Sequence, residues 1–185
     1  MSNSLAISSQ LTFVRLRGIM GHFHEASARY NVPVSLLLAV ASRESNMGLA
    51  LDKDYTGDHG FGMGIMQIDK RYHADFTNAY ANNDHGANID YGSRFLAGLI
   101  GRFNGELLPA IAAYNSGFTR VRNAINAGIH PDLVTTGRDY ASDVLQRKQL
   151  IESTLGISKA QSASVVLLPT LMVAFATYSI LNHKS

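Results

Sequence analysis

Three carboxyl groups, those of Glu44, Asp58 and Asp69, lie within one short stretch of the chain, residues 43–69. Glu44 follows the apolar run SLLLAVAS at 35–42, Asp58 lies in a polar, glycine-rich segment, and Asp69 closes the short run IMQI at 65–68. A loop between a helix end and a strand end can fold back and bring such groups to one cleft. Two carboxyl groups on either side of a bond are the usual equipment for hydrolysing a glycoside. The stretch therefore predicts acid–base hydrolysis of a glycosidic bond.

The surroundings of these three acids predict different protonation states. Acidic side chains near loops mostly face solvent and do nothing further, and that is the plainer interpretation of each one taken singly. Glu44, however, lies within a turn of buried surface, and burial raises the pKa of a carboxyl group, as a general acid at neutral pH requires. Asp58 and Asp69 have polar, glycine-rich neighbours whose hydrogen bonds can keep them ionised. The pattern indicates one acid and two ionised partners.

The elements that must position these groups follow from hydrophobic spacing. Pro33 fits the first position of a helix that runs to about residue 45, and residues 36–40 are apolar on every side, which predicts a buried central helix. A small β-hairpin or sheet is expected near 62–69, at one edge of a cleft. Other helices are predicted over 8–30, 87–103, 107–115, 118–127 and 138–153. The predicted fold class is mainly α (α+β), with a small sheet and a C-terminal helix.

Composition narrows the classes of protein that fit. With 185 residues, 46% of them hydrophobic, the chain suits one compact domain with a real core. A formal net charge of +2 suits an acidic substrate or an anionic membrane surface, but it is too small, and too scattered, for a nucleic-acid-binding protein. The absence of cysteine excludes disulfides and thiolate chemistry. We expect no nucleic-acid partner and a monomer.

Three motifs invite a metal or nucleotide interpretation, and each is incomplete. Asp52 opens a sequence like the first half of a calcium loop, but its twelfth position is Met63 and no exit helix follows. The glycines at 60, 62 and 64 lack the Lys-Ser/Thr pair of a phosphate loop. The segment HFHE at 22–25 lacks the second histidine of a zinc-protease motif. We therefore expect no metal and no cofactor.

Five segments, in order and with compatible spacing, resemble the goose-type lysozymes. They are RES (43–45), GDHGFGMGIMQID (57–69), KRYH (70–73), AYNSG (113–117) and DYASDV (139–144), and the resemblance covers roughly residues 35–155. That family shares its fold and its acid with the soluble lytic transglycosylases. The chain departs from it in the shifted phenylalanine of GFGMG and in having no cysteine, but neither change touches a carboxyl group. The resemblance implies a lysozyme-like fold and cleavage of the β-1,4 bond between N-acetylmuramic acid and N-acetylglucosamine in peptidoglycan.

The resemblance and the chemistry together assign roles to the three acids. Glu44 is expected to protonate the leaving oxygen, while Asp58 and Asp69 hold and activate a water on the opposite face of the sugar. An inverting hydrolase of this kind needs a gap of roughly 6.5–9.5 Å between its carboxyl groups. The alternative is a lytic transglycosylase, which makes the same cut with the glutamate alone because a hydroxyl of the sugar replaces the water. The presence of both aspartates favours hydrolysis.

Substrate contacts are expected from tyrosine and from polar side chains, because the chain has no tryptophan to stack on sugars. The resemblance implies Tyr114, Asn115 and Tyr140 in the cleft, with Gln67 and His73 as further polar partners. Two plainer alternatives stay open. Tyr114 and Asn115 also fit a packed tyrosine and an ordinary asparagine at a helix end, and His73 also fits a structural histidine.

The resemblance ends near residue 156, which divides the chain into a catalytic domain, 1–156, and an apolar helical tail, 157–185. Residues 160–182 carry no charge, and their length just reaches across a bilayer, but Pro169 interrupts them. The tail either packs on the core, lies in or disturbs a membrane, or spans one. A bacterial outer membrane is the partner that the second interpretation predicts.

The N-terminus has no basic residue before its apolar part and no long apolar run, so it does not read as a secretory signal. We expect a phage or prophage endolysin, made in the cytoplasm of a bacterial host and released to the periplasmic wall by a holin-type partner. Two rival classes remain: a non-catalytic wall-binding module, and a holin-like membrane protein. The intact acids argue against the first, and the long polar-bearing globular region argues against the second.

Overall fold

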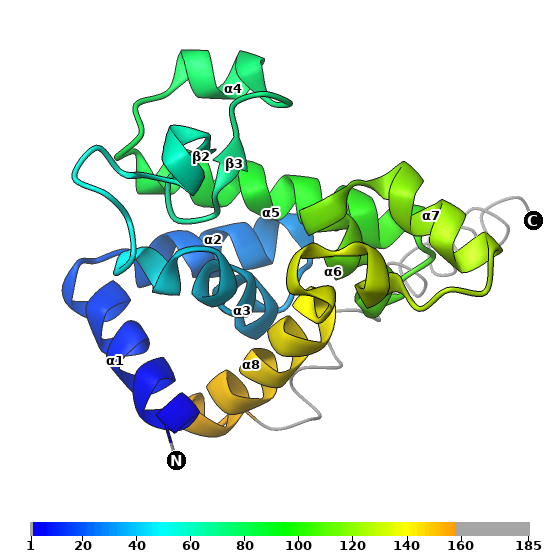
Figure 1. Ribbon diagram of the computed structural model, residues 1–185. Helices are drawn as coiled ribbons and strands as arrows, with labels where there is room; N and C mark the ends of the chain where they lie inside the picture. Colours follow the sequence, from blue (N-terminus) through cyan, green and yellow to red (C-terminus); the bar gives the residue numbers. More distant parts are fainter. Residues whose placement is uncertain (1, 158–185) are drawn as a thin grey trace, which may run out of the picture.

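The computed structural model describes residues 2–157, which form a mainly helical domain with a small antiparallel sheet (Figure 1). The predicted fold class is confirmed. The α-helices are α1 (Ser2–Leu16), α2 (Met20–Tyr30), α3 (Val34–Ser45), α4 (Ala74–Ala79), α5 (His85–Arg102), α6 (Leu107–Ser116), α7 (Phe118–Asn126) and α8 (Tyr140–Leu155). Short 3-10 helices are η1 (Asn46–Gly48), η2 (Asp58–Gly60), η3 (Pro131–Val134) and η4 (Thr136–Arg138). The strands are β1 (Thr56–Gly57), β2 (Gly62–Met63) and β3 (Ile68–Asp69).

Helix α3 lies in the middle of the molecule, with α8 and α1 on one side and α2 and α5 on the other (Figure 1). Its residues 36–41 are buried all the way round the helix. A buried leucine contributes about 1.5–3 kcal/mol, so the run Leu36, Leu37 and Leu38 holds the helix firmly among its neighbours. Pro33 occupies the N-cap position rather than the first helical turn, and the helix ends at Asn46, which takes the left-handed conformation. The last turn of α3 therefore has a fixed place.

The three strands form an antiparallel sheet in the order β1-β2-β3, and this sheet lies with α4 at the top of Figure 1. In the ladder, Gly57 pairs with Gly62 and Met63 pairs with Ile68. The side chain of Gln67 fills the space above the two glycines, because a Cβ added to either would lie within 2.4 Å of its Oε1 atom. Glycine at both positions thus lets the loop close over the Gln67 amide.

The single helix predicted over 8–30 is wrong, since two helices occupy that range. Helix α1 ends at Leu16 and α2 begins at Met20. Between them Gly18 has φ +72°, a left-handed conformation that glycine adopts without strain. The apolar spacing continues across this turn because both helices bury one face in the same core, so the spacing hides the break.

The hairpin expected near 62–69 is confirmed as β2 and β3, and most of the apolar run 65–68 is the turn between these strands. Polar groups from other elements fix the turn. The Ser45 hydroxyl donates to the Ile65 carbonyl at 2.7 Å, and the Asn88 side chain accepts from the Met66 amide at 2.8 Å. Ile65 and Met66 are fully buried. These two hydrophobic residues therefore anchor the turn in the core and do not form one face of a strand. Helix α4 is a further element that the sequence reading missed.

The start of α8 is set by Asp132, a buried side chain in η3. Its carboxylate accepts from the amides of Ala141 and Ser142 at 2.6 and 3.1 Å. Unpaired amides at a helix N-terminus favour such an acceptor, and the positive end of the helix favours its charge. Helix α8 consequently begins at Tyr140, near the expected residue 138, and the Tyr140 side chain is buried.

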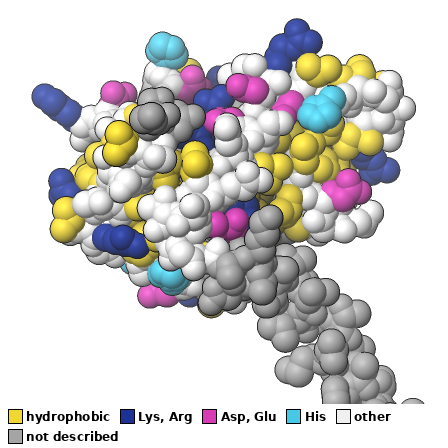
Figure 2. Space-filling model, turned by 90° about the horizontal axis from the view of Figure 1, so that it is seen from below, with side chains coloured by type: hydrophobic (Ala, Val, Ile, Leu, Met, Phe, Trp, Pro, Cys, Tyr) yellow, Lys and Arg dark blue, Asp and Glu magenta, His cyan; other side chains and the backbone are white. Residues whose placement is uncertain are grey.

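Among residues 2–157, no helix is both long enough and apolar enough to cross a membrane. Hydrophobic side chains gather on one side of the surface in Figure 2, the side on which α7 lies in Figure 1. Ile125, Ile129 and Leu133, which are exposed, follow one another from α7 into η3. The predicted apolar tail, residues 160–182, and its membrane partner lie outside the described residues.

Candidate active site

The carboxyl group of Glu44 lies at the end of the buried helix α3, in its last turn. The side chain is half-buried, and Tyr140 donates a hydrogen bond to its Oε1 atom. Burial raises the pKa of Glu44 to about 7, although the Tyr140 hydroxyl and the charge of Arg43 lower it and the charge of Asp58 raises it further. The group is therefore protonated to a useful extent near neutral pH and can release its proton, as a general acid must.

Tyr140 is held against Glu44 by the start of α8 and by Arg43. The ring is buried, and the Arg43 guanidinium lies 5.6 Å from its centre. Arg43 in turn contacts Asp139 at 3.4 Å and Asp143 at 3.1 Å, on either side of Tyr140 in the sequence. Burial, together with the nearby Glu44 charge, raises the pKa of Tyr140 well above its usual value. Its hydroxyl therefore keeps its proton and remains a donor to Glu44.

Asp58 and Asp69 come from the region of the sheet. Asp58 is the first residue of η2, which connects β1 to β2, and Asp69 is the last residue of β3. Asp58 is exposed and takes a left-handed backbone conformation with φ +48°, which is uncommon for a residue other than glycine and is frequent at functional sites. Its charge raises the pKa of Glu44, so the two groups interact across the site. Asp58 therefore lies close enough to act on Glu44 through its charge, and its part in catalysis stays a prediction.

Arg71 joins the two aspartates, and the sequence reading did not assign it a role. Its Nε atom lies 2.9 Å from Oδ1 of Asp69 and its Nη2 atom 2.5 Å from Oδ2, and its backbone amide donates to Oδ1 at 2.8 Å. Its Nη2 atom lies 3.5 Å from Oδ2 of Asp58. These contacts, led by the guanidinium hydrogen bond, lower the pKa of Asp69 below its usual value. The position of Arg71 two residues after Asp69 was the available signal.

The Arg71 guanidinium is also supported by two exposed aromatic rings. It lies 4.4 Å from the centre of the Phe61 ring and 5.8 Å from that of Tyr72. A cation over an aromatic face is attracted by the ring quadrupole, by roughly 0.5–1 kcal/mol at exposed sites. The contacts hold Arg71 in one orientation although its side chain is 48% exposed.

Tyr114 and Asn115, both predicted to contact substrate, have partners within the protein. The Tyr114 hydroxyl donates to the Met66 carbonyl at 3.0 Å, which ties α6 to the turn between β2 and β3. Burial, and secondarily the Glu44 charge, raise the pKa of Tyr114 well above its usual value. Asn115 accepts from the Thr136 amide at 2.8 Å and so fixes the segment that leads to Tyr140. Tyr114 thus lies within reach of the Glu44 charge, and direct contact of either residue with substrate stays a prediction.

Gln67 and His73 lie on the sheet side of the site. The Gln67 amide donates to the Gly64 carbonyl at 2.7 Å within its own loop. The Nδ1 atom of His73 lies 2.9 Å from the Tyr91 hydroxyl, and its ring packs edge-on against Phe95, with centroids 5.0 Å apart. Burial lowers the pKa of His73, which favours the neutral ring. These contacts stiffen the loop around Asp69, and substrate contact by either residue stays a prediction.

Comparisons with known proteins place this chain among the lysozymes of one family. The family model described as lysozyme g matches residues 10–154. Lysozyme g of Casuarius casuarius is 34% identical over 127 residues, which make up 64% of this chain and 64% of that protein. Lysozyme g of Gallus gallus is 33% identical over 124 residues, or 62% of this chain and 54% of that protein. Lysozyme g of Epinephelus coioides is 28% identical over 156 residues, or 77% and 78%. The chain spans less than two thirds of the length of the first two relatives.

Proposed function

Because this chain belongs to the lysozyme g family, we propose that it is a muramidase that hydrolyses the β-1,4 bond between N-acetylmuramic acid and N-acetylglucosamine of peptidoglycan. One observation carries the proposal: Glu44, with a pKa of about 7, ends the central buried helix and interacts with Asp58 on the facing sheet. A protonatable acid and ionised carboxylates in one site are what glycoside hydrolysis requires.

In this mechanism Glu44 protonates the oxygen of the leaving sugar. Its location at the end of an apolar helix keeps the proton on the carboxyl at neutral pH, and the Tyr140 hydroxyl stabilises the carboxylate once the proton has left. Near its pKa a group can both hold and release a proton, which is the condition under which general acid catalysis is most effective. Glu44 alone can therefore supply the proton that the leaving oxygen needs.

The water that attacks the sugar is assigned to Asp58 and Asp69. Arg71 holds Asp69 through a two-point contact, which keeps Asp69 ionised, and it reaches Asp58 with a longer contact, so both carboxylates are oriented. Arg71 bonds to both carboxylate oxygens of Asp69, whereas Asp58 is more exposed and has more room to accept a proton from water. We therefore assign proton acceptance to Asp58 and positioning of the water to Asp69, with inversion at the sugar carbon.

The test of this function is an analysis of the products. Peptidoglycan digested by the full chain is expected to yield muramic acid with a free reducing end, because two aspartates are present to activate water. Mass spectrometry of the digest distinguishes this end from 1,6-anhydromuramic acid, the product of a lytic transglycosylase. Anhydromuramic acid as the main product would show that Glu44 acts without an activated water. The protein would then be a lytic transglycosylase and not a hydrolase.

The contact between Tyr140 and Glu44 predicts a change in pH dependence. The Tyr140 hydroxyl lowers the pKa of Glu44, so Tyr140→Phe raises that pKa. A general acid acts when protonated, so activity falls as the pH rises through the pKa, and the alkaline limb of kcat/KM should move to higher pH in the variant. Tyr30→Phe is the matched control, since it removes a hydroxyl that donates to Asp90 at 2.7 Å. An alkaline limb that stays in place or moves to lower pH would argue against Glu44 as the acid.

We further propose that the chain acts as a bacteriolytic endolysin that reaches the wall through a membrane-permeabilising partner. The support is the uncharged segment 160–182, whose composition suits contact with a membrane. Cells that make the full chain should keep their turbidity until a holin or chloroform permeabilises the inner membrane, and should then lyse. Lysis without permeabilisation would remove the need for a release partner.

A further inference from the structure

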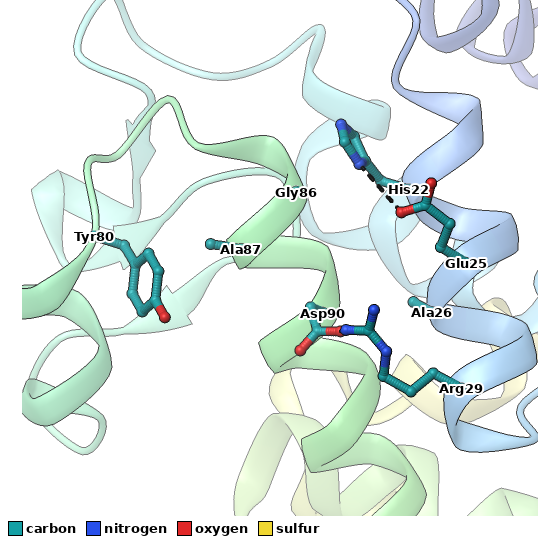
Figure 3. A pocket seen from close by; sticks show the side chains of 8 residues that line it. All are labelled: His22, Glu25, Ala26, Arg29, Tyr80, Gly86, Ala87 and Asp90. Atoms are coloured by element: carbon teal, nitrogen blue, oxygen red, sulfur yellow. Dashed lines mark hydrogen bonds and ion pairs between the residues drawn. The ribbon is translucent and has the colours of Figure 1, made fainter.

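A second polar pocket lies between α2 and α5, and none of the predicted catalytic or cleft residues lines it. Its volume is about 300 Å³. Helix α2 contributes a stripe of side chains at helical spacing, α5 contributes its first turns, and one aromatic residue follows α4. The lining residues are His22, Glu25, Ala26, Arg29, Tyr80, Gly86, Ala87 and Asp90 (Figure 3). Ligand pockets of proteins usually begin at about this size.

The charged groups of this pocket are paired and held in place. Arg29 donates to Asp90 across the two helices, and the Tyr30 hydroxyl donates to the other carboxylate oxygen of Asp90 at 2.7 Å. On the rim, His22 and Glu25 lie 3.9 Å apart. The Arg29 guanidinium and the Asp90 carboxylate hold each other in place and neutralise each other's charge. Each still has N–H groups or lone pairs with which a ligand can form hydrogen bonds.

The opposite side of the pocket is an aromatic ring, as Figure 3 shows for Tyr80. Tyr80 is 48% exposed, and it stacks on the buried Phe76 with centroids 5.0 Å apart. Phe76 stacks in turn on Tyr91 at 4.2 Å. The ring is therefore held from behind, and it presents a flat apolar surface with a polar tip to the pocket.

We propose that this pocket is a non-catalytic carbohydrate-binding site that holds one or two sugar rings of a glycan chain. A neutral polyol can bond to the paired Arg29 and Asp90 without breaking their contact, while an ionic ligand would have to separate them. The C–H face of a sugar ring fits the flat face of Tyr80. Among residues 2–157 no cluster of three or more His, Asp or Glu side chains could bind a metal ion there. The choice of an N-acetylhexosamine glycan rests on the proposed function, whereas the class of neutral carbohydrate rests on the pocket itself.

Such a site would bind one stretch of a cell-wall glycan while a second stretch is cleaved at Glu44. Its loss should weaken attachment to insoluble wall and leave the cutting of short soluble chains unchanged. This separates the second site from the cleft, whose loss affects both substrates.

The test is an NMR titration of the full chain carrying Glu44→Gln, with tri-N-acetylchitotriose as the probe. Saturable shifts are expected at the amides of Tyr80, Gly86 and Ala87, separate from those at Ser45 and Gln67, which report on the cleft. Ala87→Leu fills the pocket and should abolish the first set. Gly98→Leu adds the same side chain to the same helix, where nothing lies within 4 Å of the new Cβ, and should abolish neither.

A second variant keeps the test independent of any effect of Ala87→Leu on packing. Tyr80→Ala should weaken binding at the pocket roughly 2- to 10-fold, the range that an aromatic contact contributes. Unshifted pocket amides, or shifts that persist unchanged in both Ala87→Leu and Tyr80→Ala, would overturn the second site whatever the cleft does. Unshifted cleft amides would count against the proposed function instead, so the two failures are distinguishable.

Discussion

Replacing Glu44 by Gln is expected to abolish wall lysis while leaving the fold intact. General acid catalysis contributes about 10²- to 10⁴-fold, and glutamine fills the same space but cannot donate a proton to the leaving oxygen. The rate of turbidity loss of purified cell walls measures the effect, and circular dichroism checks the fold. Glu106→Gln is the matched control, because Glu106 is an exposed glutamate at the start of α6 and should keep full activity. Near-normal lysis by the Glu44 variant would refute its role as the acid.

The same variant should change how stability depends on pH. Burial raises the pKa of Glu44 from 4.5 to about 7 in the folded protein. The protonated carboxyl therefore contributes stability that is fully present below pH 4.5 and is lost as the pH rises through 7. This contribution is at most about 3 to 4 kcal/mol, since one unit of pKa corresponds to roughly 1.4 kcal/mol. Urea unfolding should show a steeper fall in the free energy of unfolding over this range for the unsubstituted chain than for Glu44→Gln.

Replacing Arg71 by Ala is expected to lower kcat by roughly 10- to 100-fold, because misplacing a catalytic group by about 1 Å can cost that much. Arg71 holds Asp69 at two points and reaches Asp58, so its loss frees both carboxylates. Arg71→Lys keeps the charge but not the planar two-point contact, so its kcat should lie between that of the unsubstituted chain and that of Arg71→Ala. Arg120→Ala, at an exposed position on α7, is the control and should leave kcat unchanged.

The pH profile separates positioning from a merely structural role for Arg71. Its contact lowers the pKa of Asp69, so removing it raises that pKa. Because the carboxylate must be ionised to hold the water, activity should be lost at a higher pH on the acid side. The acid limb of kcat/KM should therefore move up in Arg71→Ala and stay in place in Arg120→Ala. A uniform loss of activity with no movement of the acid limb would reduce Arg71 to a structural residue.

The sequence by itself determined the position of Glu44 at the end of a buried helix and most of the helices. An apolar run that continues all round a helix can be stable only if the helix is buried, and a carboxyl group at its end must then lose part of its hydration. That local argument predicts the raised pKa of Glu44, which the structure confirms. Turn residues and hydrophobic spacing likewise predict α3, α5, α6, α7 and α8 to within a few residues, because both reflect interactions between near neighbours in the chain.

The tertiary structure alone decided which side chains meet. Tyr140 donates to Glu44 from 96 residues away, and Ser45 and Asn88 convert an apolar run that reads as a strand into an anchored turn. Arg71 is close to Asp69 in sequence, but only the folded sheet brings its guanidinium to Asp58 as well. Such contacts depend on the direction in which each side chain leaves its element and on how distant elements pack. Periodicity and composition carry no record of either, so the position of Glu44 could be read from the chain while the contacts that surround it could not.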